Sequence, residues 1–148
     1  MTLPEQERER FCQVLHHSRT SLYRLAFSIT RNSSDAQEAV AEAVCRAYER
    51  YPQLREKEKL PRWLLKITAN EARRLCQRRG RTVSLDDLPT EPAIPGRETG
   101  DDTLWQAVQT LPRDQREAVV LFYYEDLPTE EIARIVGTSP GAVRVRLS

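Results

Sequence analysis

The segment from Thr82 to Gly100, TVSLDDLPTEPAIPGRETG, interrupts a chain that otherwise follows a helical pattern. It holds three prolines and two glycines and shows no helical period, so it is poorly suited to continue a helix. Its charged side chains are mostly acidic. A segment of this composition is typical of a linker between folding units. We therefore predict two domains, at 1–81 and 101–148, joined by a flexible acidic linker at 82–100.

On both sides of this linker the pattern predicts an all-α protein. The chain has only five glycines and no short turn flanked by alternating apolar residues, which argues against β-hairpins. Apolar residues recur at helical spacing in three N-terminal stretches, at about 4–30, 35–51 and 61–79. Beyond the linker we expect short helices at about 102–110 and 113–124. A length of 148 residues allows one domain or two small ones.

The last twenty residues, TEEIARIVGTSPGAVRVRLS, have the pattern of a helix-turn-helix. Ala133 allows the two helices to cross closely, and Gly137 allows the left-handed turn between them. Ser139 is suited to cap the second helix, whose first turn accepts the proline that follows. Arg144 and Arg146 come near the end that such motifs insert into the DNA major groove. The alternative is an ordinary helical hairpin with a surface arginine pair.

Charge is strongly segregated along the chain, although the net charge is only +1. Residues 55–81 carry ten basic and three acidic side chains, whereas residues 82–131 carry three basic and twelve acidic ones. Residues 132–148 add three arginines and no acid. A single charged run is usually a solvated surface. Two basic segments separated by an acidic one favour two contacts with a polyanion.

The third expected helix combines a tryptophan near its start with a cluster of cations. Bases stack on aromatic side chains and phosphates need cations, so this helix is a candidate surface for single-stranded DNA. For Trp63 alone, a place in the hydrophobic core is the simpler interpretation. The polar and aromatic residues in question are Trp63, Lys66, Asn70, Arg73, Arg74, Arg78 and Arg79.

Other features argue against membrane, metal and catalytic functions. No apolar run is long enough to span a membrane, and the polar start is unlike a signal peptide. Three widely spaced cysteines, Cys12, Cys45 and Cys76, suggest reduced and mostly buried thiols in a cytoplasmic protein. His16 and His17 lack the partner motifs of a zinc site. We expect no metal, no cofactor and no enzymatic activity.

Three stretches of the sequence resemble group 4, extracytoplasmic-function sigma factors of the sigma-70 superfamily. LYRLAFSITRNSSDAQEAVAEAVCRAYERY and the helix starting PRWLLKITANEARRL resemble region 2 of that family, over residues 22–79. LPRDQREAVVLFYYEDLPTEEIARIVGTSPGAVRVRL lies within residues 103–148, which resemble region 4. The resemblance implies an RNA polymerase sigma factor that directs core polymerase to promoters. Its partners would be promoter DNA and core RNA polymerase, through the β′ clamp helices and the β flap.

The resemblance also implies roles for individual residues. The core polymerase contact would comprise Asp35, Glu38, Val40 and Glu42. The loop at 53–62 would capture a flipped −10 base, and the −10 contacts would be the seven residues of the basic helix named above. The −35 contacts would be Ser139, Pro140, Gly141, Arg144 and Arg146. The sequence departs from the family pattern at Gln37, Ala41, Arg74, Ala142 and Val145.

Two alternatives stay open at this point. One is a LuxR-like helix-turn-helix regulator with a helical sensor domain, and the other is a helical adaptor with no DNA role. An anti-sigma factor is a further candidate partner that the sequence neither requires nor excludes. Because only nine residues follow Ser139, whereas the family usually continues further, we expect a region 4 that is incomplete at its C-terminus.

Overall fold

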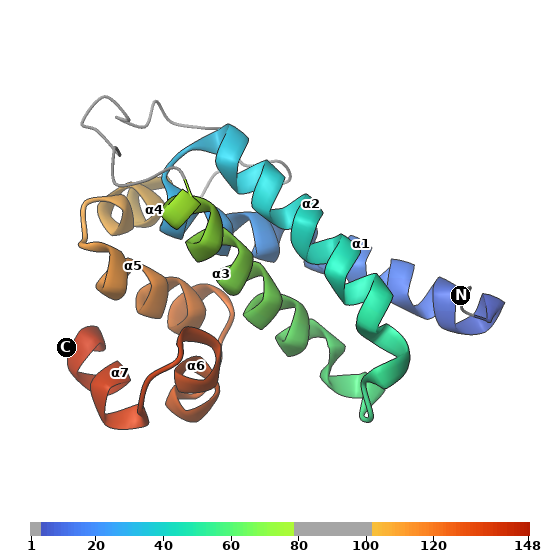
Figure 1. The fold of residues 1–148 in the computed structure, drawn as a ribbon. Coiled ribbons are helices and arrows are strands. Elements are labelled where there is room, and N and C mark those ends of the chain that lie inside the picture. The colour runs from blue at the N-terminus through green and yellow to red at the C-terminus, as the bar shows by residue number, and fades with distance from the viewer. Residues whose placement is uncertain (1–3, 79–101) are drawn as a thin grey trace.

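A computed structural model describes residues 4–78 and 102–148, and these residues form helices and turns without a strand (Figure 1). The expected all-α class is confirmed. The expected linker at 82–100 and the predicted DNA contact Arg79 lie outside the described residues.

The N-terminal unit is a three-helix bundle of α1 (Glu5–Thr30), α2 (Ser33–Arg50) and α3 (Leu60–Arg78). Asn32 lies between the first two helices and its side chain accepts a hydrogen bond from the Asp35 backbone N–H at 2.9 Å, which caps α2. The buried face of α2 is lined by alanines, so α1 and α3 can approach it closely. The larger side chains of the core come from α1 and α3, among them Leu22, Leu25 and Leu64, all fully buried.

The polar loop between α2 and α3 is ordered by one lysine. Two short 3-10 turns, Tyr51–Gln53 and Lys57–Lys59, make up most of it. The Lys57 ammonium donates to the backbone carbonyls of Tyr51 at 2.8 Å and Leu54 at 2.9 Å, and it lies 4.3 Å from the centre of the Tyr51 ring. These contacts fix the shape of the loop that precedes the basic helix.

The C-terminal unit contains α4 (Asp102–Gln109), α5 (Arg113–Val119), α6 (Thr129–Val136) and α7 (Pro140–Leu147). The helix expected at 113–124 continues beyond α5 as a π-helical turn, Val120–Tyr124. The helix-turn-helix is formed as predicted. Gly137 closes α6 with φ of 79°, the Ser139 hydroxyl accepts from the Ala142 N–H at 3.1 Å, and Val143 is fully buried.

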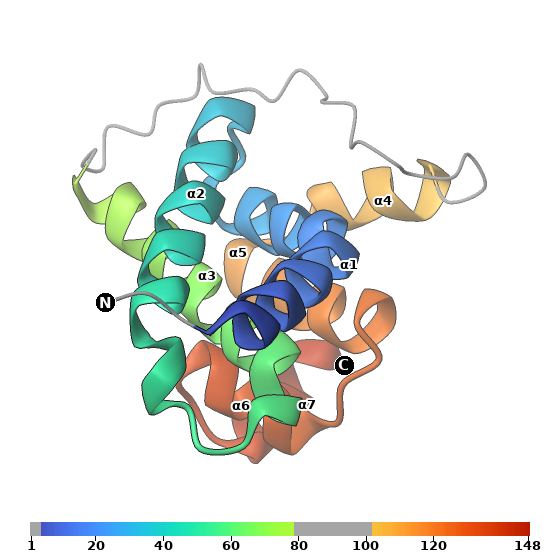
Figure 2. The same ribbon diagram turned by 90° about the vertical axis from the view of Figure 1, so that its right-hand side faces the viewer.

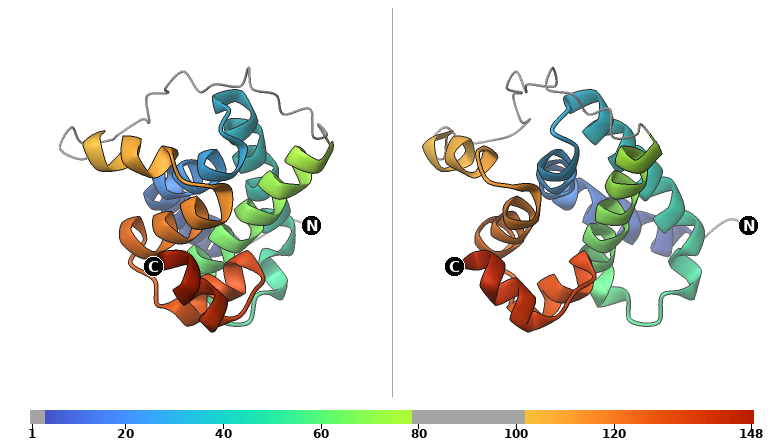
Figure 3. Two further views of the ribbon diagram at one scale, coloured as in Figure 1. Left: turned by 90° about the vertical axis from the view of Figure 1, so that its left-hand side faces the viewer. Right: turned by 60° about the vertical axis from the view of Figure 1, so that its left-hand side comes forward.

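The two units pack against each other. α5 and the π-helical turn contact α1, and α6 contacts α3. Figures 2 and 3 show the C-terminal unit along α1 and α3, with α2 on the far side of the bundle. Buried residues of both units form one continuous cluster, in which Phe27 of α1 and Trp105 of α4 have ring centres 6.3 Å apart. The sequence predicts two separately packed domains, and the contact between them is a finding of the tertiary structure.

The cysteines differ from expectation. Cys12 and Cys45 are exposed and Cys76 is half-buried, so the prediction of mostly buried thiols is wrong for the first two. All three are free thiols. Among the described residues, no cluster of His, Cys, Asp and Glu is suited to a metal ion, and no helix is long and apolar enough to cross a membrane.

Candidate nucleic-acid interface

The basic helix α3 presents part of its predicted DNA-binding set to solvent. Lys66, Asn70, Arg74 and Arg78 are exposed on it. Trp63 is half-buried and packs against the hydrophobic core, which agrees with the simpler interpretation of that residue. The exposed residues lie at i, i+4, i+8 and i+12, so they follow one helical stripe. A stripe of cations with one amide suits contact with a nucleic acid backbone.

A buried carboxylate restrains one of these cations. Glu71 of α3 is only 6% exposed. It forms an ion pair with Arg46 of α2, with 2.6 Å between the charged atoms, and accepts a hydrogen bond from Arg74 at 2.8 Å. The pair with Arg46 joins α2 to α3. Arg74 keeps half of its side chain exposed, so one phosphate can still be reached while the arginine stays oriented.

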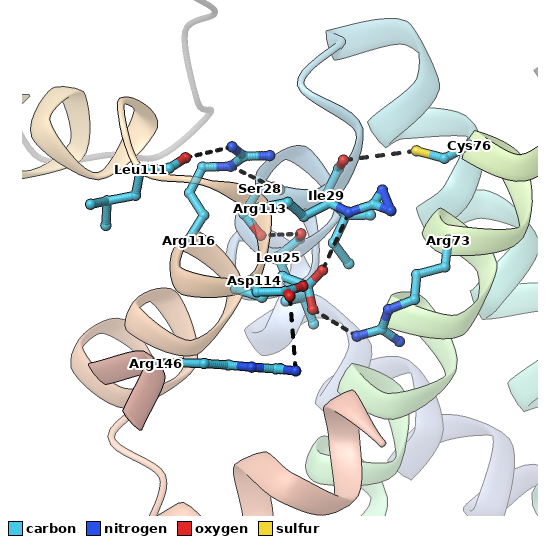
Figure 4. A network of polar contacts seen from close by, with 11 residues as sticks. Leu25, Ser28, Ile29, Arg73, Cys76, Leu111, Arg113, Asp114, Arg116 and Arg146 are labelled. Carbon is cyan, nitrogen blue, oxygen red and sulfur yellow. Dashed lines mark hydrogen bonds and ion pairs between the residues drawn. The ribbon is translucent and has the colours of Figure 1, made fainter. Parts of the chain in front are cut away.

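Arg73 is held differently from its neighbour. Its guanidinium donates at 2.7 Å to Glu117 of α5, whose side chain is 3% exposed, while that of Arg73 is 27% exposed. Figure 4 shows Arg73 reaching from α3 toward α5. This predicted −10 contact is therefore occupied by a carboxylate of the other unit. Arg62, within the loop predicted to capture a flipped base, likewise pairs with Glu131 of α6 at 3.2 Å.

The N-terminal end of α7 forms the second predicted DNA surface. Ser139, Gly141 and Arg144 are exposed, and Pro140 is half-buried in the first turn. Arg146 is 25% exposed, and its guanidinium lies 3.9 Å from the Asp114 carboxylate, as Figure 4 shows. The exposed cap and turn match the end of a recognition helix that enters a major groove.

The predicted polymerase-binding residues all lie on α2, but not on one side of it. Glu38 and Glu42 are exposed, and Asp35 is half-buried next to the cap. Val40 is also half-buried and lines a groove of about 360 Å³ between α1 and α2. The exposed carboxylates give α2 a charge for a basic protein partner, and the groove at Val40, which also contains Arg19, lies on the side of α2 that faces α1.

Sequence reasoning missed the charged residues that join the two units. Arg116 and Glu117 are 4% and 2% exposed. Burial lowers the pKa of Arg116 to about 10, with Arg31 and Arg113 adding repulsion, so it stays cationic at neutral pH. A signal was present in the sequence, because Glu117 falls in helical phase with the apolar Val120 and Leu121.

The architecture, a basic helical unit joined to a helix-turn-helix, is that of a two-part DNA-binding protein. Residues 14–82 match the family described as Sigma-70 region 2, and residues 101–148 match Sigma-70, region 4. The chain is 32% identical to RNA polymerase sigma factor SigV of Bacillus subtilis, over 84% of this chain and 76% of SigV. It is 30% identical to the ECF sigma factor SigE of Mycolicibacterium smegmatis, over 85% and 52%.

A solved structure resembles the whole arrangement. It is the sigma factor RpoE in complex with the anti-sigma factor NepR from Bartonella quintana, with a TM-score of 0.74, 26% identity, and coverage of 94% of this chain and 90% of that one. The chain belongs to the sigma-70 family, as a sigma factor of the extracytoplasmic-function type that acts in transcription initiation. This decides against the LuxR-like regulator and the adaptor.

Proposed function

We propose that the chain recruits core RNA polymerase through α2 and places it on promoters through α3 and α7. The observation that carries this proposal is that two of the predicted DNA-binding sets are exposed on separate units of one sigma factor: the α3 stripe from Lys66 to Arg78 and the cap of α7 at Ser139. The α3 stripe and the 53–62 loop serve the −10 element, and α7 serves the −35 element. Phosphate contacts by arginines set affinity, while Asn70 and the loop set sequence preference.

Core polymerase binds, in this proposal, to the exposed acidic side of α2. Carboxylates that meet basic groups of a partner form charge-assisted hydrogen bonds, and the apolar groove at Val40 adds buried area. The β′ clamp helices are the expected partner there, and the β flap is the expected partner of region 4. An anti-sigma factor is a further proposed partner, supported by the NepR complex of the similar structure. The site of action is then the cytoplasm, and the chain itself has no catalytic role.

The test is in vitro transcription with core polymerase on a randomised promoter library. The wild-type chain is expected to enrich two sequence elements about 25 base pairs apart, and polymerase without the chain is expected to enrich neither. The double variant Asp35→Lys/Glu38→Lys should lose co-purification with core polymerase and all transcription while keeping its helicity. Transcription without enrichment of any element, or unchanged polymerase binding by the double variant, would contradict the proposal.

A further inference from the structure

Lys57 lies in the middle of the loop between α2 and α3, yet its ammonium binds the protein's own backbone. Its Nζ donates to the carbonyls of Tyr51 at 2.8 Å and Leu54 at 2.9 Å. Nζ also lies 4.3 Å from the centre of the Tyr51 ring, within the range of a cation–π contact. An ammonium has three N–H donors. Two carbonyls and a ring face therefore occupy most of its binding capacity.

The position of this ammonium follows from the way α2 ends. The last carbonyls of a helix lack partners within the helix and carry the negative end of its dipole. Beyond Arg50 the chain makes a 3-10 turn, in which the Tyr51 carbonyl accepts from the Leu54 N–H at 3.0 Å. The Lys57 ammonium adds a second hydrogen bond to the same carbonyl. A cation placed at the C-terminal end of a helix is stabilised both by these bonds and by the dipole.

The hydrophobic core fixes both ends of the loop. Tyr51 is fully buried, with its ring centre 5.3 Å from that of Phe11, and Leu60 at the start of α3 is fully buried as well. Between these ends, Leu54 packs against the core and Lys57 binds the end of α2. The middle of the loop is thus held by one apolar contact and by one ammonium.

The other residues of the loop are open to solvent. Those exposed between its two buried ends are Pro52, Gln53, Arg55, Glu56, Glu58 and Lys59. Lys59 pairs with Glu56 at 2.8 Å, but the two side chains are 63% and 55% exposed, and surface pairs of this kind contribute little stability. The two lysines of the loop therefore differ in kind. Lys59 extends into solvent, whereas Lys57 is bound to backbone carbonyls.

A loop that reads bases gains from having its shape fixed in advance. Ordering a flexible loop during binding costs free energy, and a loop that is already ordered avoids that cost. Phosphate contacts add affinity for any sequence, whereas base contacts need a correctly placed backbone. An ammonium whose donors are taken by carbonyls is poorly placed to bind a phosphate. Lys57 can therefore affect sequence preference without contacting DNA.

We infer that Lys57 is a positioning residue for the reading of the −10 element. It binds the loop to the C-terminal end of α2 and so fixes the backbone that carries exposed residues such as Gln53 and Arg55. The inference rests on the proposed function, because it takes the 53–62 loop as the part that captures a −10 base. By charge alone, Lys57 belongs to the basic segment 55–81 and would count as a phosphate contact. Its hydrogen bonds assign it a role inside the protein.

The first test measures the order of the loop in the free chain by amide hydrogen exchange. Lys57→Met keeps the length and the apolar stem of the side chain and removes the ammonium. The Leu54 N–H, which donates within the turn that the ammonium holds, should then exchange about tenfold faster. Lys59→Met is the charge-matched comparison. It removes one cation from the same loop but leaves the bonds of Lys57 in place, so the Leu54 N–H should exchange at the wild-type rate.

The second test measures sequence preference with core polymerase bound to the chain. This complex is titrated with two fluorescent single strands of about 12 nucleotides, one with the −10 element enriched from the promoter library and one with that element scrambled. Lys57→Met should lower the affinity for the enriched strand about tenfold and leave that for the scrambled strand unchanged. The slope of log affinity against log salt should stay at its wild-type value. Arg78→Ala is the contrasting variant, because loss of a phosphate contact should weaken both strands alike and reduce the slope by about 0.7.

Three results would overturn the inference. The first is a slope for Lys57→Met that falls by about 0.7 with equal losses on both strands, because Lys57 would then be a phosphate contact. The second is faster exchange at Leu54 with an unchanged preference between the strands, because the order of the loop would then not govern base reading. The third is an unchanged exchange rate at Leu54. If the wild-type complex itself shows no preference between the strands, the proposed function fails, while the exchange rates still decide whether Lys57 orders the loop.

Discussion

The interior of the three-helix bundle and the junction between the two units are built from different chemistry. The bundle interior is made of aliphatic and aromatic side chains with small alanines on α2. Among the residues that the structure describes, its one buried carboxylate is Glu71, which pairs with Arg46 and Arg74. The junction places Arg116 and Glu117 side by side in a nearly water-free position. The junction also buries apolar side chains, with Phe27 and Trp105 in one cluster that spans both units, so what distinguishes it from the bundle interior is the paired charge that it buries as well. The bundle interior is therefore held almost entirely by apolar packing, whereas the junction combines apolar packing with paired charges.

The largest effect is expected from the bundle interior. Leu64 is fully buried on α3. Leu64→Ala should lower the free energy of unfolding by about 3 kcal/mol, through lost transfer energy and the remaining cavity. Urea denaturation followed by circular dichroism measures this loss. A value below about 1 kcal/mol would mean that the bundle repacks as readily as the junction does.

Breaking the ion pair at the centre of the junction should separate the two units and leave the bundle folded. Glu117→Gln removes the partner of Arg73 and leaves Arg116 buried beside an uncharged side chain. The arrangement with the two units packed together should lose about 3 kcal/mol of stability relative to the arrangement with the units apart. Small-angle X-ray scattering should then give a larger radius of gyration, while the urea midpoint of the bundle stays within error of wild type. If the units separate and the bundle also becomes less stable, the two regions fold as one unit.

Two arginines of α3 allow a sharper comparison. Arg78 is exposed, whereas Arg73 is paired with Glu117. Arg78→Ala should reduce the slope of log affinity for single-stranded DNA against log salt by about 0.7, the value for one lost phosphate contact. In the wild-type chain, Arg73→Ala should reduce this slope by less than Arg78→Ala does. Glu125 pairs with Arg24 of α1 across the junction, at 3.1 Å. In a chain that also carries Glu125→Gln, Arg73→Ala should reduce the slope by as much as Arg78→Ala does. Equal reductions in the wild-type chain would mean that the pair with Glu117 does not restrict Arg73.

The smallest effect concerns the second predicted DNA surface, at the start of α7, where Ser139 is exposed. Ser139→Ala removes the acceptor for the Ala142 N–H and should destabilise α7 by about 1 kcal/mol. Affinity for duplex DNA containing the −35 element should fall several-fold, and affinity for single strands should not change. Ser139→Asp is the control, because aspartate also caps a helix.

Local rules predicted most of the elements. Asn32 and Ser139 cap their helices, Gly137 takes up the left-handed turn, and the helix bounds agree with the expected ones within about two residues. Each of these signals acts between residues that are close in the chain. The exposed stripe of α3 followed from the same helical spacing. The exception is the end of the 113–124 helix, where the backbone widens into a π-helical turn that no nearby residue predicted.

The sequence by itself determined the helical class, the helix-turn-helix and the two-part organisation, because spacing, capping and turn chemistry are short-range. The family followed from the resemblance of three stretches of the sequence to known sigma factors. Only the tertiary structure decided which cations stay available. Arg73 and Glu117 are 44 residues apart, and Arg24 and Glu125 are 101 apart. Their pairing depends on how two finished helical units meet, which helical periodicity does not encode. A charge count therefore identified the basic helix, while the packing of the C-terminal unit decided that Arg73 is held by a carboxylate and Arg78 is left exposed.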